Sequence, residues 1–500
     1  MRYYKKKSKA LFFKNIMNST TQGIDSYGFH AGVFYIISTL RKKGFDIVLS
    51  KSKVSLSDNE FITDIDDLIN ILKTNPDITF IGITLLESYF EKVEKLINFL
   101  TKKTNAFIAV GGVMPTLTPL HVFYHLKNVN FVIRGAGEIV LPEILTILNG
   151  QNRTTPLTVK QQRNLKKIKG IAFRQNKLII LDNIDDVNEI DEYDKYNLDF
   201  SFIEKNDIQD GLFLYTSRCC KNNCFFCTTP GKGKFVAKSI DNLKEILDSY
   251  YFRLKELFGK NIPSITLSLA FYDDDFLGDA QRSINFLRYI RCSPFYINFF
   301  QTGINSFFIN NGKSKNKLNY ELLDIISPDL FSHKKTHIYI GTENFSDAEL
   351  ERLGKGYNVE QVGQVIKELT KRKIYQRHHW IFSNVFTTLE DIAENLSKIS
   401  QLKLKYSPYF NILFPFINYL GSFYPSISYA ILKRKGLLRY LKIRKMLRIK
   451  GHPDLNYPLV NHDIPIDKKA RYVAGHIDQI LNSSNDDIEV LRKIKNKFLF

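Results

Sequence analysis

The sequence has no apolar run long enough to cross a membrane. Its longest apolar stretches, such as Ile78–Leu86 and Phe410–Phe416, have the length of a strand, whereas a spanning helix needs about 20 predominantly apolar residues. The apolar run Ala10–Phe13 follows a basic cluster and is too short for the core of a signal peptide. We therefore expect a cytoplasmic protein without a membrane span.

Cysteine is scarce, and its distribution argues against a disulfide framework. Only five cysteines occur, and four of them, Cys219, Cys220, Cys224 and Cys227, lie close together in the sequence. Disulfides between near neighbours close almost no loop, so this clustering favours ligation of a metal ion or an iron–sulfur cluster. Cys292 stands alone, and we expect it to be a buried apolar residue.

The chain lacks internal repeats and long low-complexity tracts, and its 500 residues exceed what one ordinary core organises. Four apolar runs near its start predict buried parallel strands separated by crossover helices: Phe45–Ser50, Ile78–Leu85, Phe107–Gly112 and Phe131–Arg134. This pattern predicts an α/β, doubly wound sheet. Such sheets bind ligands beyond the carboxyl ends of their strands. One crevice would therefore be lined by Thr84, Gly111, Gly112, Gly135 and Gly137.

A second series of six strand-like runs alternates with helical segments and predicts a partial (β/α)6 barrel. The six runs are Leu212–Tyr215, Ile265–Leu269, Ile297–Gln301, His337–Gly341, Trp380–Ser383 and Tyr409–Phe414. Between the two series, Gly170–Phe173 and Leu178–Leu181 predict a hairpin. The expected regions are a Rossmann-like domain at 1–150, a linker with the hairpin at 151–210, the barrel at 211–417 and a helical, basic carboxyl-terminal region at 418–500.

The spacing Cys220-x3-Cys224-x2-Cys227 follows the first barrel strand, so three thiolates lie on one loop and can converge on one cluster. Three protein ligands leave one iron of a four-iron cluster open, as a reacting small molecule requires. A zinc site needs a fourth ligand, and only Cys219 is close in sequence. Cys219 also offers the C-x4-C-x2-C spacing of plant ferredoxins, with Cys292 as a distant fourth ligand.

The segment Tyr215–Cys227 resembles the opening of radical S-adenosylmethionine (SAM) domains, where a strand leads through Thr-Ser-Arg-Gly into C-x3-C-x2-C. Cys219 stands where those domains usually have glycine. Phe271–Phe276 resembles the acidic strand end of the family, and Ile340–Asn344 with Leu353–Gln361 resembles its fourth strand and following helix. The resemblance implies a radical SAM enzyme over most of the predicted barrel.

By that resemblance, Cys220, Cys224 and Cys227 hold a four-iron four-sulfur (4Fe-4S) cluster, and SAM chelates its open iron. Reductive cleavage of SAM then gives a 5′-deoxyadenosyl radical, with the electron supplied by a donor such as flavodoxin or ferredoxin. Three acidic residues near the mouth of the barrel would bind the amine or ribose hydroxyls of SAM: Asp273, Asp274 and Glu343. Phe382–Asp391 departs from the Gly-Pro-Gly-containing loop that relatives commonly have there.

A doubly wound domain before a radical SAM domain is typical of a subfamily that binds cobalamin, and Gly111–Thr116 and Phe131–Glu138 are similar to its cobalamin-binding domain. Glycines after buried strands let the backbone approach a flat ligand, and Thr84 adds a hydroxyl. The motif D-x-H-x-x-G, which supplies a histidine to cobalt, is absent, so we expect cobalamin without that ligand. A dinucleotide site is less favoured, because Gly135-x-Gly137 lacks the third glycine.

The formal net charge of +20 suggests an anionic partner. Ile431–Lys450 carries nine Lys or Arg residues and no acid, which predicts a basic amphipathic surface helix. It lacks a recognisable nucleic-acid-binding module, so we expect a small-molecule or peptide substrate and no nucleic acid.

The sequence is consistent with three functions. The leading one is cobalamin-dependent radical SAM catalysis with methyl transfer to an unactivated carbon or to phosphorus. The first alternative uses the same radical for cyclisation, rearrangement or oxidation. The second is a non-catalytic iron–sulfur or zinc protein that binds nucleic acid.

Overall fold

The computed structural model describes residues 8–15, 31–53, 65–85, 90–175, 178–181, 192–208, 211–229, 234–309, 317–331, 337–412, 418–419, 426–436 and 467–470. They form two compact units. Unit 1 contains the described residues up to Phe213 together with Val236–Thr266. Unit 2 contains Leu214–Phe235 and the described residues from Leu267 onward.

Unit 1 is built on a sheet in the order β2-β1-β3-β4-β5-β6-β7. Its strands are β1 (Lys9–Asn15), β2 (Asp46–Lys53), β3 (Ile78–Thr84), β4 (Phe107–Gly111), β5 (Phe131–Ile133), β6 (Ile171–Gln175) and β7 (Leu178–Leu181). Strands β1 to β5 pair in parallel, and β6 and β7 add an antiparallel hairpin at the edge. Every residue of β3 except its last is buried, as expected of a central strand covered on both faces.

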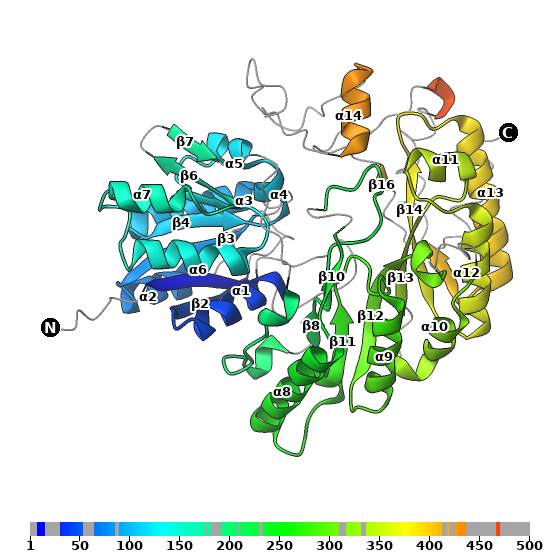
Figure 1. Ribbon diagram of the computed structural model, residues 1–500, viewed down its shortest axis with the longest axis horizontal. Coiled ribbons are helices and arrows are strands. Elements are labelled where there is room, and N and C mark those ends of the chain that lie inside the picture. Colours follow the sequence, from blue (N-terminus) through cyan, green and yellow to red (C-terminus); the bar gives the residue numbers. More distant parts are fainter. Residues whose placement is uncertain are drawn as a thin grey trace. The chain divides into compact units, whose positions relative to one another are not determined.

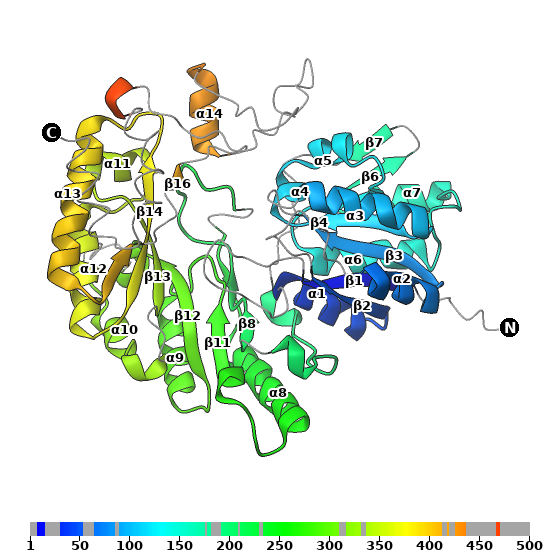
Figure 2. The same cartoon turned by 180° about the vertical axis from the view of Figure 1, so that it is seen from behind.

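Helices of unit 1 cover both faces of this sheet (Figures 1 and 2). The helices that do so are α1 (Ala31–Lys42), α2 (Ile65–Thr74), α3 (Phe90–Lys103), α4 (Val113–Leu117), α5 (Pro119–His125), α6 (Gly137–Leu148) and α7 (Val159–Leu165). Unit 1 also contains α8 (Ile240–Phe258), which does not lie on this sheet. Helix α6 is in front of the sheet in Figure 1 and α3 is in front of it in Figure 2, so the sheet is doubly wound.

The sequence pattern missed one strand of unit 1 and separated the hairpin from its sheet. Strand β1 contains Ala10–Phe13, whose four apolar residues are all buried between the partners β2 and β3. A run this short carries little periodic signal by itself. The predicted hairpin is present, and Phe173 of β6 pairs with Phe131 of β5, so the hairpin extends the sheet.

Unit 2 is built on a curved sheet in the order β15-β14-β13-β12-β11-β8, with β16 paired to β14 (Figure 1). The strands are β8 (Leu212–Leu214), β11 (Ser268–Phe271), β12 (Tyr296–Gly303), β13 (Ile338–Glu343), β14 (Gln376–Ser383), β15 (Phe410–Ile412) and β16 (Asn418–Tyr419). The chain passes from unit 1 to unit 2 within β8, between Phe213 and Leu214. The pairs from β11 to β15 are parallel, which confirms the six-strand partial barrel. The second strand begins at Ser268, because the preceding residues Ser264–Leu267 form a short 3-10 turn.

Helices of unit 2 follow the outer face of its sheet in both views (Figures 1 and 2). The helices that do so are α9 (Ala280–Arg291), α10 (Tyr320–Ile325), α11 (Asp347–Arg352), α12 (Val359–Lys371) and α13 (Leu389–Tyr406). Helix α14 (Ile427–Arg434) stands apart from this layer in both views. Capping boxes begin α12 at Asn358 and α13 at Thr388. Along β13, buried and partly exposed residues alternate, so one face of the strand packs on helices and the other does not.

Two predictions about surface segments have different outcomes. Cys292 is exposed, so the prediction that it is buried was wrong; it caps the carboxyl end of α9 at the surface. Of the basic segment Ile431–Lys450, residues 437–450 lie outside the described residues. Among the described helices, none is long and apolar enough to cross a membrane.

Candidate functional site

The cysteine loop of unit 2 follows β8 and the short strand β9 (Ser217–Arg218). Its first residue, Cys219, has a φ of 61°, in the left-handed region that costs a side chain energy and favours glycine. This conformation gives a physical reason why related domains carry glycine at this position.

The loop is held from the opposite side by the segment that follows α11. The Phe225 N–H donates to the Leu353 carbonyl at 2.9 Å, and the Phe225 carbonyl accepts from Ser428 at 3.0 Å. The Phe225 ring covers Gly354, where an added Cβ would lie 2.5 Å from the ring. Because Gly354 also has a φ of 66°, only glycine fits there without strain. Phe226 packs on Leu353.

Two of the three thiols receive N–H donors from their own loop. Asn222 donates to the Cys220 sulfur from its backbone at 3.4 Å and from its side chain at 3.3 Å. The Thr229 N–H donates to the Cys227 sulfur at 3.4 Å. Such N–H to sulfur contacts stabilise thiolates and tune the potentials of iron–sulfur clusters.

The third thiol, Cys224, is buried next to a cation. Burial raises the pKa of Cys224, while the Lys355 ammonium beside it acts in the opposite direction. Burial, followed by the charge of Asp275, raises the pKa of Cys220 to about 12. Both thiols are therefore protonated in the free protein, and binding iron would release their protons.

Lys355 is a buried cation that the sequence did not reveal. Its ammonium lies 3.5 Å from Glu343 Oε1, with both side chains largely buried. Burial lowers the pKa of Lys355, but Tyr357, Glu343 and Cys224 together raise it by more, so Lys355 remains charged. Glu343 has a φ of 69°, and such backbone outliers in non-glycine residues concentrate at functional sites.

Three consecutive acids follow β11 and differ in their surroundings. Asp273 is buried and accepts hydrogen bonds from Thr216 at 3.0 Å and from the Ser217 hydroxyl at 2.5 Å, which fixes the chain just before the cysteines. Asp274 is exposed, but the protein packed around it and the charge of Asp273 raise the pKa of its carboxyl to about 6. Asp274 is thus the better placed of the two to reach a ligand.

Asp275 is the third acid and was not selected from the sequence. Its carboxylate lies 3.8 Å from the Cys220 sulfur and accepts from Thr302 at 2.6 Å and from Ser306 at 2.7 Å. Burial raises the pKa of Asp275, against the effect of these hydroxyl donors. Asp275 therefore links the cysteine loop to the carboxyl end of β12.

A 4Fe-4S cluster fits this loop by the chemistry of its donors. The described residues contain no group of three His, Cys, Asp or Glu side chains placed to hold a single metal ion. In a four-iron cluster each cysteine binds its own iron, so the three thiols need not meet at one point. The assignment of Cys220, Cys224 and Cys227 as ligands stays a prediction, supported by the N–H donors and by Lys355.

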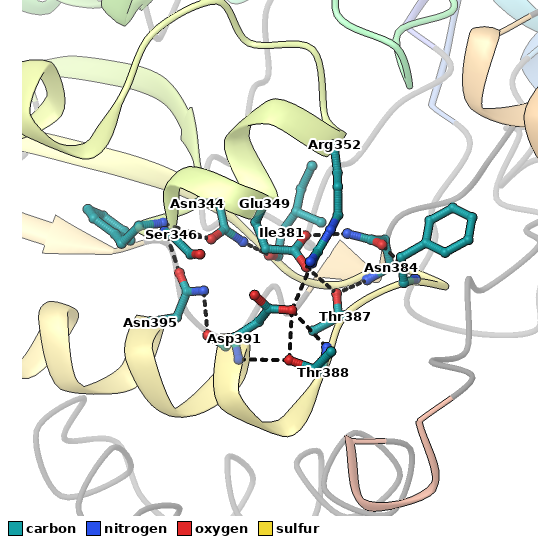
Figure 3. A network of polar contacts seen from close by, with 12 residues as sticks. Asn344, Ser346, Glu349, Arg352, Ile381, Asn384, Thr387, Thr388, Asp391 and Asn395 are labelled. Atoms are coloured by element: carbon teal, nitrogen blue, oxygen red, sulfur yellow. Dashed lines mark hydrogen bonds and ion pairs between the residues drawn. The ribbon is translucent and has the colours of Figure 1, made fainter.

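A buried polar network lies at the loop after β14, where the sequence departs from the Gly-Pro-Gly-containing loop (Figure 3). Glu349 of α11 is 1% exposed and is bound by Arg352, by Asn384 and by the Thr387 hydroxyl at 3.0 Å. Arg352 also pairs with Asp391 of α13 at 2.7 Å. The network fixes the loop between β14 and α13 through side chains instead of glycine turns.

In unit 1, the residues predicted to line a crevice lie at the carboxyl ends of neighbouring strands. Thr84 and Gly111 are register partners at the ends of β3 and β4. Gly112 has a φ of 118°, and a Cβ there would lie 3.0 Å from the Leu85 carbonyl oxygen, so glycine is required. Gly137 begins α6, where an added Cβ would lie 2.8 Å from Ile36, so its small size serves helix packing.

Thr116 ties the two glycine turns together. Its hydroxyl donates to the Gly112 carbonyl at 2.7 Å and accepts from the Gly135 N–H at 3.0 Å. Its own carbonyl accepts from the buried Arg134 at 3.1 Å. Thr116 is part of the motif Gly111–Thr116, but only the hydrogen bonds in the structure show that it bridges the two turns.

Comparison with known proteins matches both units. Residues 23–145 match the B12 binding domain family. One similar solved structure is the cobalamin-dependent SAM radical enzyme OxsB with aqua-cobalamin and SAM bound. Its TM-score to this chain is 0.69 at 17% sequence identity, and the alignment covers 98% of this chain and 70% of the OxsB chain. These matches confirm the resemblance to cobalamin-binding radical SAM enzymes.

Two sequence relatives carry names that differ in reaction. An uncharacterized methyltransferase, PH0819 of Pyrococcus horikoshii, is 24% identical over 396 residues, which cover 76% of this chain and 74% of the relative. The 4′-phospho-dehydrooxetanocin synthase of Priestia megaterium is 24% identical over 365 residues, covering 69% of this chain and 45% of the relative.

Proposed function

We propose that this protein is a cobalamin-dependent radical SAM enzyme that cleaves SAM reductively and transfers a methyl group to an unactivated carbon or phosphorus centre. The observation that carries the proposal is a three-cysteine loop that follows β8 and β9, in a sheet whose strands β11 to β15 pair in parallel, in a chain that also matches the B12 binding domain family. The similarity to a named methyltransferase supports the choice of methyl transfer.

In the proposal, Cys220, Cys224 and Cys227 bind the cluster, and Thr84, Gly111, Gly112 and Gly135 bind cobalamin. When bound, the cluster would supply the electron that breaks a sulfur–carbon bond of SAM, and cobalamin would carry the methyl group. Lys355 neutralises charge beside Cys224. Asp274 and Glu343 offer carboxylates to the amine or ribose hydroxyls of SAM. An electron donor such as flavodoxin or ferredoxin is part of the proposal.

A second candidate uses the same cleavage of SAM for cyclisation, rearrangement or oxidation. The similarity to a protein named as a synthase favours keeping it. The two candidates differ in one product, because transfer of a methyl group from SAM releases S-adenosylhomocysteine.

The test is anaerobic incubation of the reconstituted protein with SAM and a low-potential reductant. We expect 5′-deoxyadenosine to accumulate, and S-adenosylhomocysteine with it when hydroxocobalamin is supplied. The matched control is Cys292→Ala, which removes an exposed cysteine outside the loop and should leave both products unchanged. If 5′-deoxyadenosine forms without S-adenosylhomocysteine, the second candidate takes the place of the first. If neither product forms in protein that holds four irons per chain, the proposed function is wrong.

A further inference from the structure

Strand β14 presents two histidines in succession, and their surroundings are opposite. His378 faces the helices and uses both ring nitrogens, with Nδ1 2.6 Å from the Thr342 hydroxyl and Nε2 3.0 Å from Gln376. His379 points to the other face, where its Nε2 is buried from solvent without a hydrogen-bond partner among the described residues. His378 is therefore a structural residue, whereas His379 has an open hydrogen-bonding position.

Arg377 shares that face of β14, because side chains two residues apart lie on the same side of a strand. Its Nε is also buried without a hydrogen-bond partner among the described residues. No carboxylate of the described residues forms an ion pair with its guanidinium. Ser383, on the same face further along, has a buried hydroxyl in the same condition. Buried polar groups without partners are rare in native proteins, so three on one strand face require an explanation.

The central part of this face of the sheet is exposed to solvent at Gln301. Gln301 of β12 is exposed, although β12 pairs with a strand on each side and helices cover the other face of the sheet. Gln301 is the register partner of Tyr339, which is the register partner of Arg377. The Tyr339 ring lies 6.0 Å from the ring of His379. These side chains therefore line one face of the sheet, which is exposed at Gln301 and buried at the Arg377 Nε and the His379 Nε2.

On this face, the positive charge of Arg377 is not paired with a carboxylate of the described residues. Glu343 is already paired with Lys355. Arginine stays charged at all physiological pH values and offers a planar fork of donors that matches carboxylate or phosphate oxygens. Burial lowers the pKa of His379, so its ring is neutral and can donate one N–H to the same anion.

The position suits an anchor for a substrate. Glu343, beside the cysteine loop, is in register with Trp380, three residues along β14 from Arg377. At about 3.3 Å per residue, Arg377 lies about 10 Å along the strand from that level. A molecule held by Arg377 through one end would place its other end near the cysteine loop.

We propose that Arg377 and His379 bind a carboxylate or phosphate group of the substrate. This inference rests on the proposed function in taking the ligand to be the substrate of that reaction. The rings of Tyr339 and Phe299, which lie 5.3 Å apart on the same sheet, would contact the apolar part of the molecule.

The test is ligand-observed fluorine NMR on the full chain with its cluster reconstituted. The probes are 4-fluorobenzoate and 4-fluorophenyl phosphate, with neutral 4-fluorobenzyl alcohol as the reference. We expect saturable line broadening by at least one anion, and the anion that binds more tightly identifies the source as carboxylate or phosphate. Arg377→Gln should raise its Kd at least tenfold and His379→Gln about threefold, whereas Arg377→Lys should give an intermediate Kd because it keeps the charge without the fork.

The matched control is Lys367→Gln, which removes one positive charge from the exposed side of α12 and should leave Kd unchanged. A thermal melt of each variant verifies that it is folded. Equal binding of the anions and the alcohol, no saturable binding, or an unchanged Kd in folded Arg377→Gln would each overturn the proposal. Because the titration contains no SAM, the two proposals can fail separately: a wild-type protein that makes 5′-deoxyadenosine but binds neither anion would reject this inference and leave the proposed function standing.

Discussion

Two adjacent thiols of the cysteine loop have different surroundings. Cys219 has left-handed backbone geometry, whereas the Cys220 sulfur receives two donors from Asn222. Donors that point at a sulfur favour its thiolate, which is the form that binds iron. These donors therefore support Cys220 as the first ligand.

Replacing any one of the proposed ligands Cys220, Cys224 and Cys227 by Ala should abolish the cluster after anaerobic reconstitution. Cys219→Ala should keep about four irons and four sulfides per chain, as should the control Cys292→Ala. Iron and sulfide analysis with the visible absorption spectrum measures the outcome. Retention of the cluster in Cys220→Ala together with its loss in Cys219→Ala would reverse the ligand assignment.

Two glycines of unit 2 should respond to alanine with opposite signs. Gly354 has a φ of 66°, and an added Cβ would meet the Phe225 ring at 2.5 Å, so Gly354→Ala should destabilise unit 2 by about 2–3 kcal/mol. Gly363 lies inside α12 with nothing within 4 Å of its added Cβ, so Gly363→Ala should stabilise by up to about 1 kcal/mol. Denaturant unfolding measures both; equal effects would show that Phe225 moves aside.

At the scale of elements, the network of Figure 3 joins α11, α13 and the loop between β14 and α13. Arg352→Met would leave the buried Glu349 carboxylate without its cation and should destabilise by about 2 kcal/mol. Adding Glu349→Gln in the same chain should recover part of this loss, because the amide carries no charge. Additive effects in this double-mutant cycle would show that the two side chains are not energetically coupled.

His378 predicts how β14 contributes to stability at different pH values. Burial lowers its pKa to about 3, against an ordinary value of 6.5, so the unfolded chain binds the proton more readily than the folded one. Stability from this group is complete above pH 6.5 and falls by up to about 1.4 kcal/mol per pH unit as the pH drops toward 3.

His378→Gln should therefore show a smaller loss of unfolding free energy between pH 7 and pH 5 than the wild type, whatever its stability at pH 7. Urea unfolding at the two pH values measures the difference. An unchanged pH dependence would mean that His378 is not the titrating group.

The elements differ in how far the sequence predicts them, for physical reasons. Long apolar runs such as Ile78–Leu85 are local signals, and this one predicted a strand that the structure confirms. The spacing from Cys220 to Cys227 is also local; it lies on the loop after β9, and its binding of a cluster stays a prediction. Strand β1 is short, and its burial comes from β2 and β3, which are distant in sequence. The ion pair of Lys355 with Glu343 and the open position of Arg377 depend on strand register, which no local pattern specifies.

At the scale of the whole molecule, the proposed cofactors belong to different compact units. The glycine turns at the ends of β4 and β5 lie in unit 1, and the cysteine loop lies in unit 2. Each set of contacts is internal to its unit, from Thr116 with Gly112 to Phe225 with Leu353. The two proposed binding functions should therefore be separable by substitution, although the proposed methyl transfer would need both.

Gly112→Ala should reduce hydroxocobalamin uptake at least tenfold and keep the cluster, because its added Cβ meets the Leu85 carbonyl within unit 1. Cys224→Ala should lose the cluster and keep cobalamin. Gly259→Ala is the matched control, since Gly259 also has positive φ in unit 1 but nothing lies within 4 Å of its added Cβ; it should keep both cofactors. Equilibrium dialysis measures cobalamin uptake and iron analysis measures the cluster in the same samples. If either substitution removes both cofactors, the two units do not bind them independently. Normal uptake of cobalamin by Gly112→Ala would place the cobalamin site away from the ends of β3 and β4.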